Sequence, residues 1–195
     1  MKATSLLLFS LLTTFSYSSE LMIYQEDNKA LIYHSRVFEK IQESLMNFGI
    51  RFERWDAHDC PVETMCAQQI QQIYEKDIWR LQEEEGFSSY DVISISSGYV
   101  DKESLRQKFL FEHTHDEPEI RFFVSGSGLF YLHIDDKVIS VLCEQGDLIA
   151  VPENIPHWFD MGRDPSFSAI RFFTKKEGWI AYPTGSAIAQ GYVKE

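Results

Sequence analysis

Two hydrophobic periodicities divide the chain into a helical first part and a β-rich second part. In residues 28–50, apolar residues at Val37, Ile41, Leu45 and Phe48 recur near helical spacing, and Gly49 can end that helix. Residues 60–87 predict a second helical region, with Gly86 as its stop. Apolar or alternating runs predict short strands at Leu21–Tyr24, 51–57 and 90–96.

After Gly98 the pattern changes to short apolar runs that are separated by Gly, Pro, Asp or Asn. These runs predict strands at Lys108–Phe111, Glu119–Val124, Gly128–Ile134, Lys137–Leu142, Asp147–Val151, His157–Phe159 and Ser168–Thr174. Many short strands at such intervals are typical of a β-sandwich or barrel. We therefore expect one domain in which N-terminal helices pack on a C-terminal β-barrel.

The first twenty residues are set apart from this domain. One Lys is followed by the apolar run Leu6–Leu12, and Ser16-Tyr17-Ser18 fits a small-x-small cleavage pattern. The segment is either a secretory signal or a wrongly assigned start, because Met22 opens the first strand-like run. The apolar run is too short to span a bilayer. We therefore expect residues 1–20 to be an extension and residues 21–195 to be the single domain.

The net charge of the chain limits the kinds of molecule that the protein can bind. The chain has 195 residues and a formal net charge of −12, and such a surface repels phosphate backbones. We therefore expect no nucleic-acid partner, and the shortness of the apolar run Leu6–Leu12 predicts no membrane insertion. Cys60, Cys66 and Cys143 are odd in number and irregularly spaced, which is not a disulfide framework.

The stretch "FLFEHTHDEPEIRFF", from Phe109 to Phe123, carries unusual ionisable chemistry between aromatic flanks. His113 and His115 are two apart, so they share one face of a strand. Glu119 and Arg121 alternate along the next segment. If these faces line the barrel interior, the charges are costly unless they are paired or bound to metal. Neutral imidazoles and a carboxylate are suitable metal ligands.

This pattern resembles the cupin superfamily. Its first signature is matched by His113, His115, Glu119 and Gly126, with Gln107 in place of an earlier glycine. Its second signature is matched by Gly146, Pro152 and His157, with Asn154 in place of a glycine. The resemblance implies four metal ligands, namely His113, His115, Glu119 and His157. It also implies a mainly β fold with N-terminal helices, the cupin double-stranded β-helix or jelly-roll barrel.

Within that superfamily the chain is similar to the acireductone dioxygenase family over roughly residues 21–190. The similarity lies in "KFLFEHTHDEPEIRFFVSGSGLFYLH", "HWFDMG", "FSAIRFF", "GWIA", "RFERWDA" and "DIWRLQEEEGFSSYDVI". Pro118 departs from the family, which usually has an acidic residue before the ligand Glu119. A proline there can stiffen the loop and change how ligand movement is relayed.

The resemblance implies cleavage of 1,2-dihydroxy-3-keto-5-methylthiopentene by O2, with one Fe(II) or Ni(II) ion per chain. The iron form of the family makes formate and 4-methylthio-2-oxobutanoate, the methionine precursor of a salvage route. The nickel form makes methylthiopropanoate, formate and carbon monoxide. Four ligands in an octahedral field leave two positions, which suit a substrate with two adjacent oxygens. Arg121 is the catalytic candidate, because its charge can stabilise a dianionic substrate in a low-dielectric pocket.

Each supporting residue has an ordinary structural alternative. Arg121 can instead pair with Asp116 or Glu117. Phe109, Phe159 and Trp179 are either walls of the substrate pocket or core residues. Glu112 points away from the ligand face, so it supports a ligand from behind or lies at the surface. His133 has no partner at ligand spacing and is expected to be structural.

Two other functions are compatible with a cupin barrel. A metal-stabilised binding module would not need Arg121 or the aromatic lining. A sugar-phosphate isomerase would need basic residues to hold phosphate, and the cavity-facing positions offer only Arg121. We expect a cytoplasmic enzyme, because an acireductone forms inside the cell and is unstable in air. We also expect the protein to be a monomer. The signal-like residues 1–18 favour the alternative of export.

Overall fold

The computed structural model describes residues 18–60, 65–175 and 178–192. The predicted apolar leader, Leu6–Leu12, lies outside these ranges. Within them, no helix is both long enough and apolar enough to cross a membrane. Strand β1 begins at Glu20, so the last residue of the segment that was set apart from the domain belongs to the barrel.

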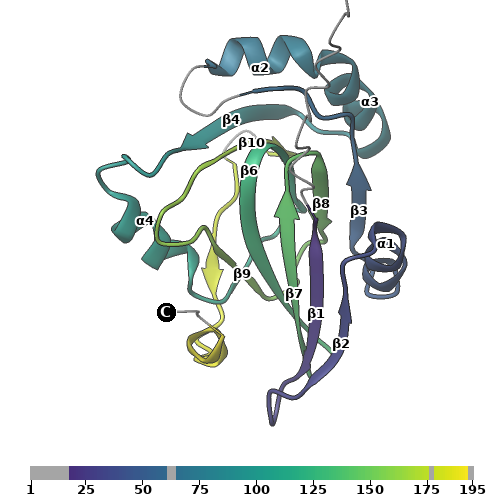
Figure 1. The fold of residues 1–195 in the computed structure, drawn as a ribbon, viewed down its shortest axis with the longest axis vertical. Helices are drawn as coiled ribbons and strands as arrows, with labels where there is room; N and C mark the ends of the chain where they lie inside the picture. The colour runs from purple at the N-terminus through teal and green to yellow at the C-terminus, as the bar shows by residue number, and fades with distance from the viewer. Residues whose placement is uncertain (1–17, 61–64, 176–177, 193–195) are drawn as a thin grey trace, which may run out of the picture.

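The barrel consists of antiparallel strands arranged in two sheets that share one long strand, β6 (Figure 1). One sheet has the order β11-β5-β9-β6-β7-β1-β2, and the other is formed by β4, β10, β6, β8 and β3. The strands are β1 (Glu20–Gln25), β2 (Leu31–Ser35), β3 (Arg51–Arg54), β4 (Ser89–Ile95), β5 (His113–Thr114), β6 (Glu119–Ile134), β7 (Lys137–Glu144), β8 (Asp147–Val151), β9 (His157–Asp160), β10 (Phe167–Phe173) and β11 (Tyr182–Pro183). The expected cupin barrel is confirmed.

Strand β6 passes from one sheet to the other at a bend. Its first half pairs with β8 and β10, and its second half pairs with β7 and β9. The bend lies at Gly126, whose φ is +68° and where an added Cβ would lie 1.8 Å from the carbonyl oxygen of Ser166. Glycine is required there, because any side chain would strike backbone. The two strands predicted for this region are therefore one bent strand.

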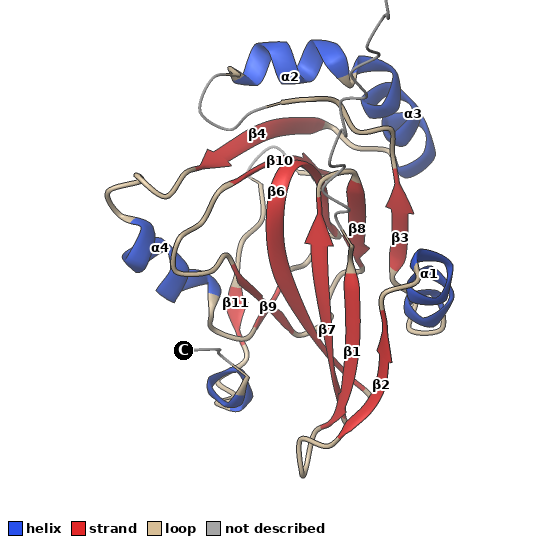
Figure 2. Cartoon of the chain, in the orientation of Figure 1, coloured by secondary structure: helices blue, strands red, loops and turns tan. Residues whose placement is uncertain are grey.

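The N-terminal helices cover the outside of the barrel (Figure 2). They are α1 (Phe38–Met46), α2 (Ala67–Ile73) and α3 (Glu75–Glu85). Ile41 and Leu45 of α1 are buried, as their spacing predicts. Gly86 ends α3 in the left-handed conformation. The single helical region predicted at 60–87 is divided at Tyr74 into α2 and α3.

Two predicted elements were wrong. Residues 31–35, which fall within the region predicted to be helical, form strand β2. The strand predicted at Lys108–Phe111 is instead the end of helix α4 (Lys102–Phe109). This segment is rich in Lys, Glu, Leu, Arg and Gln, which favour helices, and Arg106 on its buried face pairs with Asp160 of β9 at 2.7 Å. A 3-10 turn (Ile188–Gly191) follows β11.

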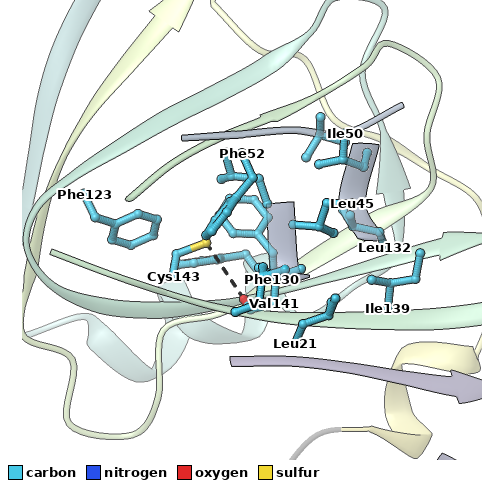
Figure 3. Packing of buried hydrophobic residues seen from close by; sticks show 14 of the residues in the cluster. Leu21, Leu45, Ile50, Phe52, Phe123, Phe130, Leu132, Ile139, Val141 and Cys143 are labelled. Carbon is cyan, nitrogen blue, oxygen red and sulfur yellow. Dashed lines mark hydrogen bonds between the residues drawn. The ribbon is translucent and has the colours of Figure 1, made fainter. Parts of the chain in front are cut away.

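The core is divided by β6, because both faces of this strand are buried. Phe123 points into the barrel cluster that Figure 3 shows with Phe52, Phe130 and Cys143. Ile120, Phe122 and Val124 alternate to the other face, beneath α2 and α3. There the rings of Phe122 and Trp55 stack with centroids 4.5 Å apart. Alternation along β6 therefore sends Glu119 and Arg121 into the barrel with Phe123.

Candidate metal centre and substrate cavity

Three histidines and one glutamate converge on the inner wall of the barrel. His113 lies on β5 and faces His157 of β9 as its register partner. Glu119 opens β6, and His115 follows β5. One ligand atom from each of the four lies within 4.8 Å of all the others. The structure thus brings together the whole predicted ligand set.

Backbone carbonyls orient all three imidazole rings. The Nδ1 atoms of His113, His115 and His157 each lie 2.7 Å from a carbonyl oxygen, of Phe111, Ile180 and Ile155 respectively. A carbonyl oxygen only accepts hydrogen bonds, so each Nδ1 carries the proton. Each Nε2 is then the nitrogen that is left to bind a metal, as in metal-binding histidines whose other ring nitrogen donates a hydrogen bond to a carbonyl. Three N donors and one carboxylate O suit a first-row transition metal ion.

Glu119 is the electrostatic centre of the cluster. It is 2% exposed, and its Oε2 lies 2.9 Å from Nε2 of His115 and 3.1 Å from Nε2 of His157. The Nε of Arg121 lies 2.7 Å from the other carboxylate oxygen as a buried ion pair. Burial alone would raise the pKa of Glu119, but Arg121 and the two imidazoles hold that pKa well below its usual range. Glu119 is therefore an anion ready to bind a cation.

The histidines differ in their electrostatic surroundings. Burial, together with the proximity of His157, lowers the pKa of His113 to about 4, so this ring is neutral at physiological pH. Burial would also lower the pKa of His115, but the hydrogen bond and charge of Glu119 raise it overall. A neutral ring at His113 is the form that binds metal.

Arg121 lies in an aromatic cage beside the ligands. Its guanidinium carbon is 4.7 Å from the ring centroid of Phe159, 5.3 Å from Trp179 and 5.9 Å from Phe109. These side chains and the four ligands line a cavity of about 200 Å³. Arg121 does not pair with Asp116 or Glu117. All three predicted pocket aromatics border the cavity, although Phe109 reaches it from the end of α4 and not from a strand.

The remaining candidate residues lie behind the ligands. Glu112 is buried and accepts hydrogen bonds from Nδ1 of His133, at 2.7 Å, and from the Thr184 hydroxyl. It therefore links the strand of His113 to the C-terminal segment. The carbonyl of Pro118 accepts a hydrogen bond from the Trp179 indole at 3.2 Å, which ties the ligand loop to the cavity wall.

The sequence reasoning missed three residues near the site. Glu117 is 2% exposed and accepts hydrogen bonds from the backbone N–H of Thr174 and Lys175. Lys108 and Arg171 line the cavity. Arg171 lies opposite Arg121 in the register of β6 and β10. The alternation of "FSAIRFF" could therefore have predicted that Arg171 lies beside the cavity. The sequence had suggested Glu117 only as a partner of Arg121, and Lys108 only as the start of a strand.

A cupin barrel whose inner wall carries three imidazoles and a carboxylate defines a metal-binding barrel of the cupin class. The model of the ARD/ARD' family matches residues 20–181. The chain therefore belongs to the ARD/ARD' family, as the sequence resemblance implied.

Individual relatives agree with this assignment. The chain is 50% identical over 175 residues to an acireductone dioxygenase of Enterobacter sp. (strain 638), covering 89% of this chain and 97% of the relative. It is 51% identical over 169 residues to that of Yersinia pestis (strain Pestoides F), covering 86% and 93%. A solved acireductone dioxygenase from Bacillus anthracis, with a cadmium ion in its active centre, superposes with a TM-score of 0.72 at 27% identity. It covers 85% of this chain and 98% of that one.

Proposed function

We propose that this protein is a metal-dependent dioxygenase that cleaves an acireductone with O2, the activity named for its relatives. The observation that carries the proposal is the orientation of His113, His115 and His157. In each ring a carbonyl holds Nδ1, so Nε2 is the nitrogen left for a metal, and one ligand atom of each ring lies within 4.8 Å of a Glu119 carboxylate oxygen. The small cavity beside them leaves room for a small molecule and not for a polymer.

The four residues are proposed to hold one Fe(II) or Ni(II) ion per chain. When bound, the ion supplies a Lewis acid and a template for two adjacent substrate oxygens. Imidazole and carboxylate accept both metals, so the ligand set does not choose between them. The products would differ accordingly: formate and 4-methylthio-2-oxobutanoate with iron, or methylthiopropanoate, formate and carbon monoxide with nickel.

Arg121 is the proposed catalytic residue. Its guanidinium is buried beside the ligands and directed into the cavity, where it can bind and stabilise an anionic enediolate without reorganisation. Phe109, Phe159 and Trp179 would exclude water and so strengthen that interaction. Glu112, by its bond to His133, and Pro118, by its bond to Trp179, are proposed to keep the ligand strands in place.

The experiment is to mix purified, metal-loaded protein with the acireductone and to follow its ultraviolet absorbance and O2 uptake. A dioxygenase consumes both, a sugar-phosphate isomerase takes up no O2, and a binding module turns over neither. His115→Ala should lose most of the metal and all turnover, whereas His34→Ala, at an exposed histidine on β2, should keep both. Full metal content and activity in His115→Ala would refute the ligand assignment.

Metal analysis of protein from its own host, followed by product analysis, identifies the product set. The monomeric state, the cytoplasmic location and the lack of a nucleic-acid partner stay predictions. Sedimentation and cell fractionation would test the first two, and a nucleic-acid binding assay the third.

A further inference from the structure

A second hollow adjoins the metal cavity. It has a volume of about 500 Å³, and it shares three lining residues with the metal cavity, namely Lys108, His113 and Ala181. Its other walls are mainly apolar and include Phe111, Pro183 and Ala187. The two hollows therefore meet at one edge of the ligand His113, with Lys108 at the junction. We call this second hollow, of about 500 Å³, the outer hollow.

Lys108 differs from the other two basic residues of helix α4, because they have ion-pair partners. Lys102 pairs with Asp164 at 2.8 Å, and Arg106 forms the buried ion pair with Asp160 that holds the helix on β9. Lys108 is exposed, and within the described ranges it makes no ion pair or side-chain hydrogen bond. The helix is thus fixed by its other two cations, and the Lys108 ammonium is available to a ligand.

The carboxylate that lines the outer hollow is held by hydrogen bonds to other side chains. It belongs to Glu112 and accepts hydrogen bonds from His133 and Thr184. Among the residues that line the outer hollow, Lys108 is the one Lys or Arg, on a protein whose formal net charge is −12. Such a local positive site can attract an anion that the rest of the surface repels.

A third hollow also reaches the metal cavity, but its charge is different. It shares Arg171 and Trp179 with that cavity. There the Arg171 guanidinium is bound by both carboxylate oxygens of Asp91, at 2.8 and 2.5 Å. At this third hollow an anion would meet the ion pair of Arg171 and Asp91. At the outer hollow it would meet the Lys108 ammonium, which has no ion pair within the described ranges.

From these features we infer that the outer hollow is the access route for the substrate, and that Lys108 captures its anionic head before the metal cavity receives it. The inference rests on the proposed function. An enediol conjugated with a ketone loses a proton readily, so the substrate is an anion with an apolar thioether tail. The outer hollow offers a cation at its inner end and apolar walls behind it, which matches both parts of that molecule.

The test compares Lys108→Glu with Lys76→Glu, which makes the same charge change at an exposed lysine on α3. Lys108→Glu should lower kcat/KM roughly tenfold and leave kcat and metal content near those of the unaltered enzyme. Its kcat/KM should also lose most of its dependence on salt. Lys76→Glu should change neither. Calorimetric binding of the acireductone without O2 should weaken by the same factor in Lys108→Glu.

A second pair of variants distinguishes the two routes by blocking them. Ala187→Trp would fill the outer hollow and should lower kcat/KM, whereas Ser89→Trp, in the hollow beside Arg171, should not. The reverse result, or equal kcat/KM in Lys108→Glu and Lys76→Glu, would overturn the inference while the proposed function stands. Failure of the unaltered protein to consume the acireductone would instead refute the proposed function.

Discussion

Replacement of Arg121 by methionine removes a charge from the substrate cavity and keeps much of the side-chain volume. The guanidinium lies 2.7 Å from the Glu119 carboxylate and is surrounded by the rings of Phe109, Phe130, Phe159 and Trp179. Its loss therefore has two separable consequences. The substrate loses an electrostatic stabiliser, and Glu119 loses the partner that compensates its buried charge.

The first consequence is a loss of turnover. Removal of one preorganised electrostatic group in a closed active site typically lowers kcat by about 10²–10³, or about 2.7–4 kcal/mol. Arg121 is buried and already placed, so we expect Arg121→Met to fall in that range with its metal retained. Arg163→Met, at an exposed arginine outside this cavity, is the control and should keep full activity.

The second consequence is a loss of stability that depends on metal. Breaking a buried ion pair costs about 3–5 kcal/mol. Glu119 keeps its contacts with His115 and His157, so we expect the lower end, about 3 kcal/mol. For a domain of this size that lowers the Tm by about 6–12 °C. In metal-loaded protein the ion itself compensates Glu119, so the decrease should be smaller.

Steady-state O2 uptake measures the first effect, and calorimetric melting of metal-free and metal-loaded protein measures the second. Near-normal kcat with full metal content would show that Arg121 is structural. An equal Tm decrease with and without metal would show that Glu119 does not face the ion.

Two further predictions concern the barrel itself. Burial would lower the pKa of His133, but Glu112 and Glu26 raise it overall. The stability that His133 contributes is therefore fully present below its unfolded pKa and is lost as pH rises through the higher folded pKa. In urea unfolding, the advantage of the native protein over His133→Gln should be larger at pH 6 than at pH 8, and an equal advantage would contradict the ion pair. Gly126→Ala should destabilise far more than Gly49→Ala. Both glycines have positive φ, which costs alanine about 1–3 kcal/mol, but only at Gly126 would the new Cβ strike backbone. Similar unfolding free energies in the two variants would refute the steric argument.

Three of the metal ligands were predictable from local spacing, whereas the fourth, His157, was assigned through the resemblance to the second cupin signature. His113 and His115 are spaced for one strand face, and Glu119 and Arg121 alternate on the next strand. The position of Phe109 beside them was also predicted, but its element was not. Helix propensity in Lys102–Phe109 and the ion pair of Arg106 outweighed the apolar pattern that favoured a strand.

Contacts between distant segments could not be read from the sequence. Glu117 accepts its hydrogen bonds from a backbone 57 residues further along the chain. Lys108 matters because Lys102 and Arg106 have partners from elsewhere in the fold. Strand β2 was missed because its edge position and exposed Leu31 and Ile32 give no alternating pattern.

The carbonyls that orient the three imidazoles belong to the main chain, and this limits how the centre can change during evolution. Where a carboxylate side chain holds a ligand histidine, one substitution can alter the basicity of that ligand. Here no side-chain replacement at Phe111, Ile155 or Ile180 deletes the acceptor. Side-chain substitutions at these three positions therefore leave the hydrogen bonds to the ligand histidines in place. An engineer who wishes to retune the metal would have to reshape the loops, for instance with a proline or an insertion.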